Sequence, residues 1–156
     1  MKKVAIILTM FSALVLGGCD TVDCSLNNTV FCYLAFYDGM SEKVALKDTL
    51  SITAYGTEKV LYNRGVGKAE IAIPMSYYNE ADTLVLTVWG KDYRMSTTII
   101  VGKSNTEYFE SPDCPVNMFH DINSVRIYRG KLADSVKVVK SSVNYQRDEN
   151  IRIYIP

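Results

Sequence analysis

The chain has little of what metal sites and nucleophilic catalysts are made from. It contains a single histidine, His120, and its four cysteines show none of the C-x-x-C or H-x-x-x-H spacing typical of zinc sites. A serine or cysteine hydrolase would need His120 as its base, but the adjacent Asp121 would point to the opposite face of a strand. We therefore expect His120 to be a structural or surface residue. We predict no catalytic residue, no metal site and no cofactor.

Neither sign of charge is in excess. The sequence holds 17 basic and 17 acidic residues without a run of lysine or arginine, so the electrostatic footprint of a nucleic-acid-binding protein is missing. We expect no nucleic-acid partner. No apolar run reaches the ~20 residues that a membrane-spanning helix needs.

The longest apolar run, residues 4–16, follows two lysines and ends in Leu16-Gly17-Gly18-Cys19. This order is typical of a secretory signal whose cleavage site is a lipobox. We predict a signal peptide over residues 1–18, lipidation of Cys19 and attachment to a membrane through acyl chains. The alternative is a plain secretory signal cut near Gly17 or Gly18, with Cys19 a disulfide partner.

After Cys19 the apolar residues alternate with period two, and no stripe has the 3.6-residue period of a helix. We predict a polar tether over 19–28 and one all-β domain over 29–156, an antiparallel β-sandwich of immunoglobulin-like or related topology. A small closed barrel is the alternative. The expected strands lie at 30–37, 50–54, 71–73, 84–88, 95–101, 106–109, 125–128, 136–139 and 151–155.

Three cysteines remain once Cys19 carries lipid, and an exported protein meets an oxidising environment that favours a disulfide. Cys24 and Cys114 lie in polar segments, whereas Cys32 alternates with Leu34 and Phe36 and is expected to face the core. We predict a Cys24–Cys114 disulfide and a buried free thiol at Cys32. A Cys32–Cys114 pair is the alternative.

Two further functions stay open from the residues alone. The 17 acids leave room for a carboxylate-based hydrolase. Aromatic side chains on a rigid β face could stack on sugar rings, although ordinary packing also uses such residues on strands. The candidates for glycan stacking are Trp89, Tyr77, Tyr78 and Tyr93.

Several segments together resemble a known family. Besides the lipobox, they are residues 23–30, 36–38, 110–115 and 149–153. With these segments the chain is similar to an uncharacterised family of Bacteroidota outer-membrane lipoproteins, and the resemblance covers essentially the whole mature chain. It implies an outer-membrane location and recurring cysteines at positions 24 and 114. It implies no activity, cofactor or catalytic residue.

An Asp-Ser/Thr-aliphatic pattern that resembles the O-glycosylation acceptor of the same bacteria occurs four times. It predicts modification of at least one of Thr21, Thr49, Thr83 and Ser135, although Asp-Thr also closes turns and starts strands. The acids Asp20 and Asp23 after Cys19 resemble a surface-export signal. Display on the cell surface and a position facing the periplasm both stay open.

The expected function is that of a non-enzymatic, lipid-anchored envelope protein. A rigid β scaffold held near a membrane, without a convergent catalytic set, favours a structural or protein-interaction role. The expected partner is an outer-membrane β-barrel or an envelope complex. A glycan-binding surface lipoprotein is the first alternative, and the carboxylate-based hydrolase is the second.

Overall fold

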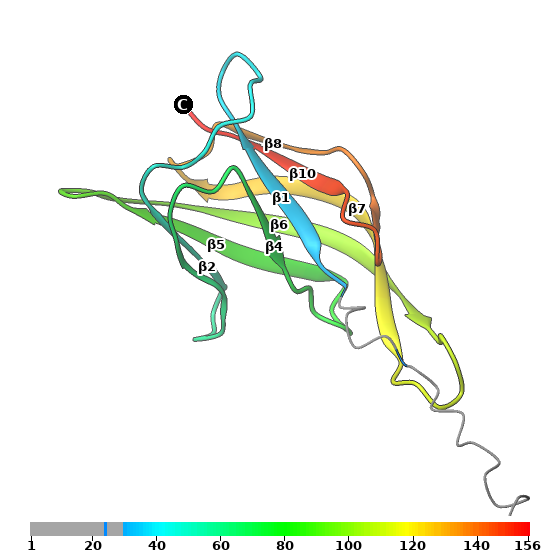
Figure 1. The fold of residues 1–156 in the computed structure, drawn as a ribbon. Helices are drawn as coiled ribbons and strands as arrows, with labels where there is room; N and C mark the ends of the chain where they lie inside the picture. Colours follow the sequence, from blue (N-terminus) through cyan, green and yellow to red (C-terminus); the bar gives the residue numbers. More distant parts are fainter. Residues whose placement is uncertain (1–23, 25–29) are drawn as a thin grey trace, which may run out of the picture.

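The computed structural model describes Cys24 and residues 30–156 (Figure 1). The predictions for the signal peptide, Cys19, Thr21 and most of the tether lie outside these residues. The described part of the chain contains no helix long and apolar enough to cross a bilayer. Its strands are β1 (Cys32–Tyr37), β2 (Thr49–Ala54), β3 (Val60–Gly65), β4 (Glu70–Ile73), β5 (Ala81–Trp89), β6 (Arg94–Tyr108), β7 (Asn117–Gly130), β8 (Ser135–Val138), β9 (Ser142–Val143) and β10 (Glu149–Tyr154).

These strands form two sheets that pack face to face. One has the order β4-β1-β10-β8 and the other the order β3-β2-β5-β6-β7-β9. The predicted β-sandwich is confirmed, and the two separate sheets exclude the closed barrel. The pairing is antiparallel except between β1 and β10, which run parallel and bring the two ends of the domain side by side in one sheet.

The core follows from the alternation along the strands. In β1, Cys32, Leu34 and Phe36 are almost completely buried, as their period-two spacing predicts. The matching positions of the other sheet, such as Leu50 and Ile52 in β2, are buried against them. The remaining fully buried aliphatic side chains are Ile73, Leu86, Ile99, Val101, Val143, Ile151 and Ile153.

Some predicted strand bounds are wrong. The runs expected at 95–101 and 106–109 are one strand, β6, and the short run at 125–128 is the end of the much longer β7. These two strands pair from Thr97↔Gly130 to Tyr108↔Asn117, so they continue as an arm beyond the last β5 partner, Gly102, and β9 pairs with β7 within it at His120 and Asp121. The arm contains few apolar residues, so its sequence shows no clear period-two alternation that would predict these strands. The sequence does not predict the edge strand β3, because none of its six residues is buried and only Leu61 and Tyr62 pack partly against the core.

The loop at the tip of this arm carries Cys114, which forms a disulfide with Cys24. Figure 1 shows the arm projecting beyond the rest of the sandwich toward the lower right. The predicted pairing is confirmed, and so is the buried free thiol at Cys32. Burial, followed by the charge of Asp82, raises the pKa of the Cys32 thiol to about 12, so the thiol stays protonated at neutral pH.

Candidate functional site

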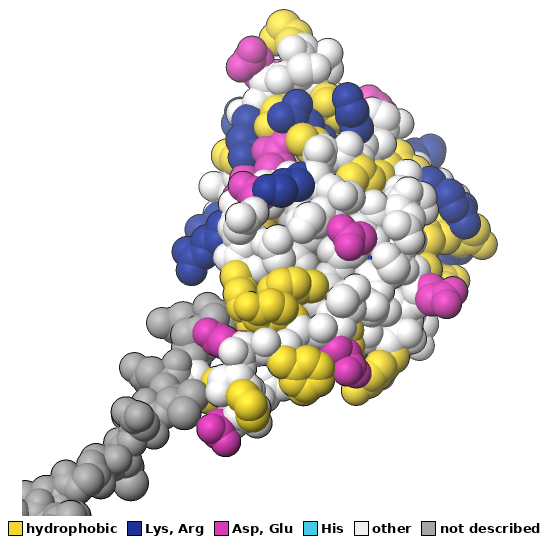
Figure 2. Space-filling view, turned by 90° about the vertical axis from the view of Figure 1, so that its right-hand side faces the viewer, with side chains coloured by type: hydrophobic (Ala, Val, Ile, Leu, Met, Phe, Trp, Pro, Cys, Tyr) yellow, Lys and Arg dark blue, Asp and Glu magenta, His cyan; other side chains and the backbone are white. Residues whose placement is uncertain are grey.

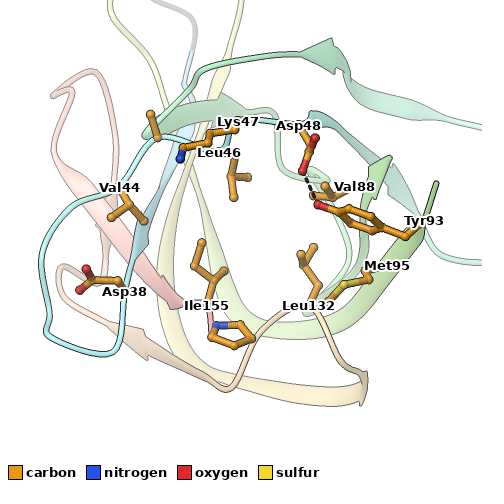
Figure 3. Close-up of a pocket in the computed structure, with 12 residues that line it drawn as sticks. Asp38, Val44, Leu46, Lys47, Asp48, Val88, Tyr93, Met95, Leu132 and Ile155 are labelled. Atoms are coloured by element: carbon orange, nitrogen blue, oxygen red, sulfur yellow. Dashed lines mark hydrogen bonds between the residues drawn. The ribbon is translucent and has the colours of Figure 1, made fainter. Parts of the chain in front are cut away.

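A pocket of about 370 Å³ opens between the two sheets at the end of the sandwich far from the disulfide. This volume is at the lower end of the range of small-ligand sites, about 300–1,000 Å³. Figure 3 shows apolar side chains around its interior, with Asp38, Lys47, Asp48 and Tyr93 also on its wall. The apolar lining consists of Val44, Ala45, Leu46, Val88, Met95, Leu132, Ile155 and Pro156.

Backbone hydrogen bonds from both sheets fix the pocket wall. The buried hydroxyl of Thr97 in β6 accepts bonds from the amides of Leu132 and Ala133 at 2.8 and 3.1 Å, which holds Leu132 toward the pocket. On the other side, the amide of Ile155 donates to the carbonyl of Tyr37 at 2.8 Å, directly after the parallel β1–β10 pair. The pocket therefore depends on segments that are far apart in the sequence.

One polar contact closes part of the rim. The Tyr93 hydroxyl in the β5–β6 turn donates a hydrogen bond to the carboxylate of Asp48, which precedes β2 (Figure 3). This hydrogen bond, with smaller contributions from desolvation and the Asp48 charge, raises the pKa of Tyr93 above its usual value. Tyr93 is still 50% exposed, so one edge of its ring is free to contact a bound molecule.

The four aromatic residues predicted to bind glycan do not share one surface. Trp89 and Tyr93 lie at the pocket end, whereas Tyr77 and Tyr78 precede β5 at its opposite end. Eight residues of strand separate the two ends of β5, which corresponds to about 27 Å. One face of the Trp89 ring is also occupied by the guanidinium of Arg94, 5.3 Å from the ring centre. A single stacking platform is therefore not formed.

A polar cluster lies inside the sandwich, and its central residue, Lys103, was not predicted from the sequence. The side chain of Lys103 is fully buried, and its ammonium donates hydrogen bonds of 2.6 Å to the carbonyls of Ser76 and Asn79 and to the side-chain oxygen of Asn105. The carboxylate of Asp82 lies 3.8 Å away. Burial lowers the pKa of Lys103. The sequence does contain a signal for this burial, because position 103 continues the period-two alternation of the inward-facing residues Ile99 and Val101.

His120 belongs to this cluster. It is 3% exposed, and its Nδ1 lies 2.7 Å from the same Asn105 oxygen, while Asp121 points into solvent on the opposite face of β7. The prediction that these neighbours face apart is confirmed. The cluster holds the 74–80 segment onto β6 and β7. No three His, Cys, Asp or Glu side chains of the described residues come together as a metal site.

We expect His120 to make stability fall between about pH 6.5 and pH 4. Burial, followed by the charge of Lys103, lowers the pKa of His120 from 6.5 to about 4 in the native state. Over this interval the unfolded chain takes up a proton that the native state does not, so the free energy of unfolding decreases as the pH falls. The loss is at most ~3 kcal/mol. Urea unfolding at a series of pH values measures it.

His120→Gln is the control for this pH dependence. Glutamine keeps a polar side chain at the position but does not titrate, so the variant is expected to have a flatter profile between pH 6.5 and pH 4. A profile with the same slope in both proteins would show that other groups are responsible.

The acidic side chains nearest to the pocket and on the four-stranded sheet are already engaged. One carboxylate oxygen of Asp38 accepts two backbone N–H groups at 2.9 Å, and Asp48 is bonded to Tyr93. On the outer face of the sheet, Glu149 accepts from Tyr37 at 2.9 Å and Arg152 at 2.6 Å. Burial by itself raises the pKa of Glu149, but these hydrogen bonds outweigh it and leave the pKa lowered.

Three of the predicted O-glycosylation sites lie on strands. Thr49 and Thr83 are partly buried, and the acids before them make structural contacts: Asp48 with Tyr93, and Asp82 with the amide and hydroxyl of Ser76. Ser135 is exposed at the start of the edge strand β8. Its modification stays a prediction, and Ser135 is the most accessible of the three.

A comparison with known families gives one match. A family of unknown function (DUF6452) matches residues 49–155, which run from the start of β2 to the residue after β10. The match includes five of the twelve residues that line the pocket and leaves out β1 and the 38–48 loop. No curated protein and no solved structure matches the chain.

Proposed function

The chain belongs to the DUF6452 family, which has no established function, and we propose that it is a non-enzymatic lipoprotein of a bacterial outer membrane that binds a protein partner. The partner inserts an apolar side chain into the pocket between the sheets. The observation that carries this proposal is the position of the pocket at the end of the sandwich opposite to the disulfide.

The anchor is supported by the sequence and by the disulfide. The lipobox makes Cys19 the acceptor of the acyl chains. Cys24 follows five residues later and is fastened to Cys114 at the tip of the β6–β7 arm. Five residues span at most ~17 Å, so the arm stays near the lipid. The family resemblance to Bacteroidota lipoproteins supports the outer membrane, with the protein on either its periplasmic or its outer face.

The binding role is supported by the chemistry of the pocket. An apolar interior with a few polar groups on its wall is typical of a recess that receives an anchoring side chain at a protein interface. Met95 in β6 lies 13 residues from Tyr108 at the arm's last paired position, about 44 Å along an extended strand. The pocket therefore opens away from the anchored end, where an envelope protein can reach it.

A photo-crosslinking experiment tests the binding role. A benzoyl-phenylalanine placed at Tyr93, on the pocket wall, is expected to give one discrete protein adduct in native membranes. The matched position is Tyr128, which is 55% exposed against 50% for Tyr93 and does not line the pocket. No adduct is expected there.

A substitution that blocks the pocket provides the second part of the experiment. Ala45 lines the pocket and is exposed, so Ala45→Trp is expected to weaken the Tyr93 adduct about tenfold or more, whereas Ala81→Trp, at the far end of β5, leaves it unchanged. An adduct that both substitutions leave intact would contradict binding through the pocket. Retention of the unmodified protein on a glycan array, with no protein adduct, would replace the proposal by glycan binding.

A further inference from the structure

A cluster of aromatic side chains, here called the aromatic tip, lies at the disulfide end of the molecule. Tyr108 and Phe119 stack across β6 and β7 with ring centres 4.4 Å apart, and Tyr145 packs edge-on against both, at 5.6 and 5.0 Å. Tyr77 lies within electrostatic range of Tyr145, and its ring centre is 6.4 Å from that of Tyr78. The aromatic tip consists of Tyr77, Tyr78, Tyr108, Phe109, Phe119 and Tyr145.

Much of this cluster is in contact with solvent. Tyr78 is 85% exposed and Phe109 is 60% exposed, although both are large rings that gain by leaving water. Figure 2 looks toward this end, and its lower part shows several hydrophobic side chains on the surface. Exposed rings concentrated in one place mark an interaction site.

The loop of the arm at the aromatic tip, residues 109–116, carries only acidic charges. Glu107 is exposed on the arm, and Glu110 and Asp113 are exposed in its loop. The dark-blue side chains of Figure 2 lie in its upper part, away from the tip. An acidic rim is repelled by anionic lipids but not by uncharged ones. We therefore expect the aromatic tip to contact a surface that accepts apolar rings and carries little negative charge.

The covalent path of the chain decides which surface this is. The disulfide joins Cys24 to Cys114 in the loop of the arm. In the sequence, Cys114 lies between Phe109 and Phe119 of the aromatic tip. Cys19 precedes Cys24 by five residues, so a lipid on Cys19 keeps the bilayer within ~17 Å of Cys24. This step rests on the lipid anchor of the proposed function.

We infer that the aromatic tip inserts into the interfacial region of the bilayer that holds the lipid anchor. Tyrosine and phenylalanine rings are favoured at this depth, where the ring leaves water and the tyrosine hydroxyl remains among the headgroups. The lipid and the tip then fix the domain at two points and set its orientation. The sandwich stands on the end of its β6–β7 arm, and the pocket faces away from the membrane.

The test uses the full chain, purified from membranes in its native acylated state and reconstituted into vesicles of zwitterionic lipid. Wild-type protein carries one tryptophan, Trp89, at the distal end. The double variant Trp89→Phe/Phe109→Trp moves the only tryptophan to the tip. Lipids brominated along the acyl chain quench nearby indole rings, so we expect loss of emission and a blue shift for the double variant. Wild-type emission is expected to be unchanged.

The outcomes separate the inference from the anchor on which it rests. If intact mass shows no acyl chains and the protein does not float with vesicles, the proposed lipid anchor fails. If the protein is acylated and floats but the tip tryptophan is not quenched, the anchor holds and the inference is overturned. Quenching of Trp89 instead would overturn it as well. Partial replacement of the zwitterionic lipid by phosphatidylglycerol is expected to reduce quenching of the tip, and an increase would contradict the role given to the acidic rim.

Discussion

Phe36→Ala is expected to lower the free energy of unfolding by about 3–5 kcal/mol. Phe36 is 0% exposed and is the largest fully buried side chain. It lies in β1, between β4 and β10 in the centre of the four-stranded sheet, where the surrounding backbone is held by ladders on both sides and cannot collapse into the cavity. Domains of this size have total stabilities of about 5–15 kcal/mol, so the loss is a large fraction. Urea unfolding followed by circular dichroism measures it.

Phe109→Ala is the matched control for this prediction. It removes the same atoms from a ring that is 60% exposed, and in solution without lipid it is expected to change the free energy of unfolding by no more than about 0.5 kcal/mol. Similar losses for both variants would contradict the assignment of Phe36 to the core.

Gly130→Ala is expected to destabilise the protein by about 3 kcal/mol. Gly130 has φ of +124°, a conformation that residues with a Cβ rarely adopt. A Cβ there would lie 2.3 Å from the carbonyl oxygen of Ser96 and 2.4 Å from the Cα of Thr97, both of them backbone atoms that cannot move aside without disturbing β6. Because Thr97 holds Leu132 at the pocket, the strain is also expected to weaken binding there.

Gly39→Ala separates this strain from the general effect of replacing glycine. A Cβ at position 39 meets nothing within 4 Å, and this glycine does not have positive φ. We expect Gly39→Ala to unfold within about 0.5 kcal/mol of the wild type. A thermal or urea midpoint for Gly130→Ala that equals that of Gly39→Ala would show that the β7 turn tolerates a side chain.

Local pattern was enough to predict the fold class, because a period of two along a strand depends only on which face is buried. The same reasoning assigned Cys32 to the core and Cys24 and Cys114 to the disulfide, since the polarity of the flanking residues reports burial. It failed for the arm of β6 and β7. There the inward position is held by Lys103, a charged residue that tertiary hydrogen bonds make acceptable in the interior.

The candidate site was the least predictable part. The sequence marked Trp89, Tyr77, Tyr78 and Tyr93 as one set because all are aromatic, but β5 places them at its two ends. The apolar residues of the pocket come from the 38–48 loop, β5, β6, the segment after β7 and the two residues after β10. In the sequence, apolar residues that line a pocket cannot be distinguished from apolar residues that fill a core.

The sequence by itself determined that this is a β protein with one buried thiol and one disulfide, because alternation and local polarity are properties of neighbouring residues. Only the tertiary structure decided which strands pair. The parallel alignment of β1 with β10 joins residues more than 110 positions apart, and no local preference selects such a partner, since every strand presents the same backbone donors and acceptors. The strand pairing is selected because it buries the apolar inward faces of all the strands at the same time. That packing places the pocket at one end and the aromatic tip at the other.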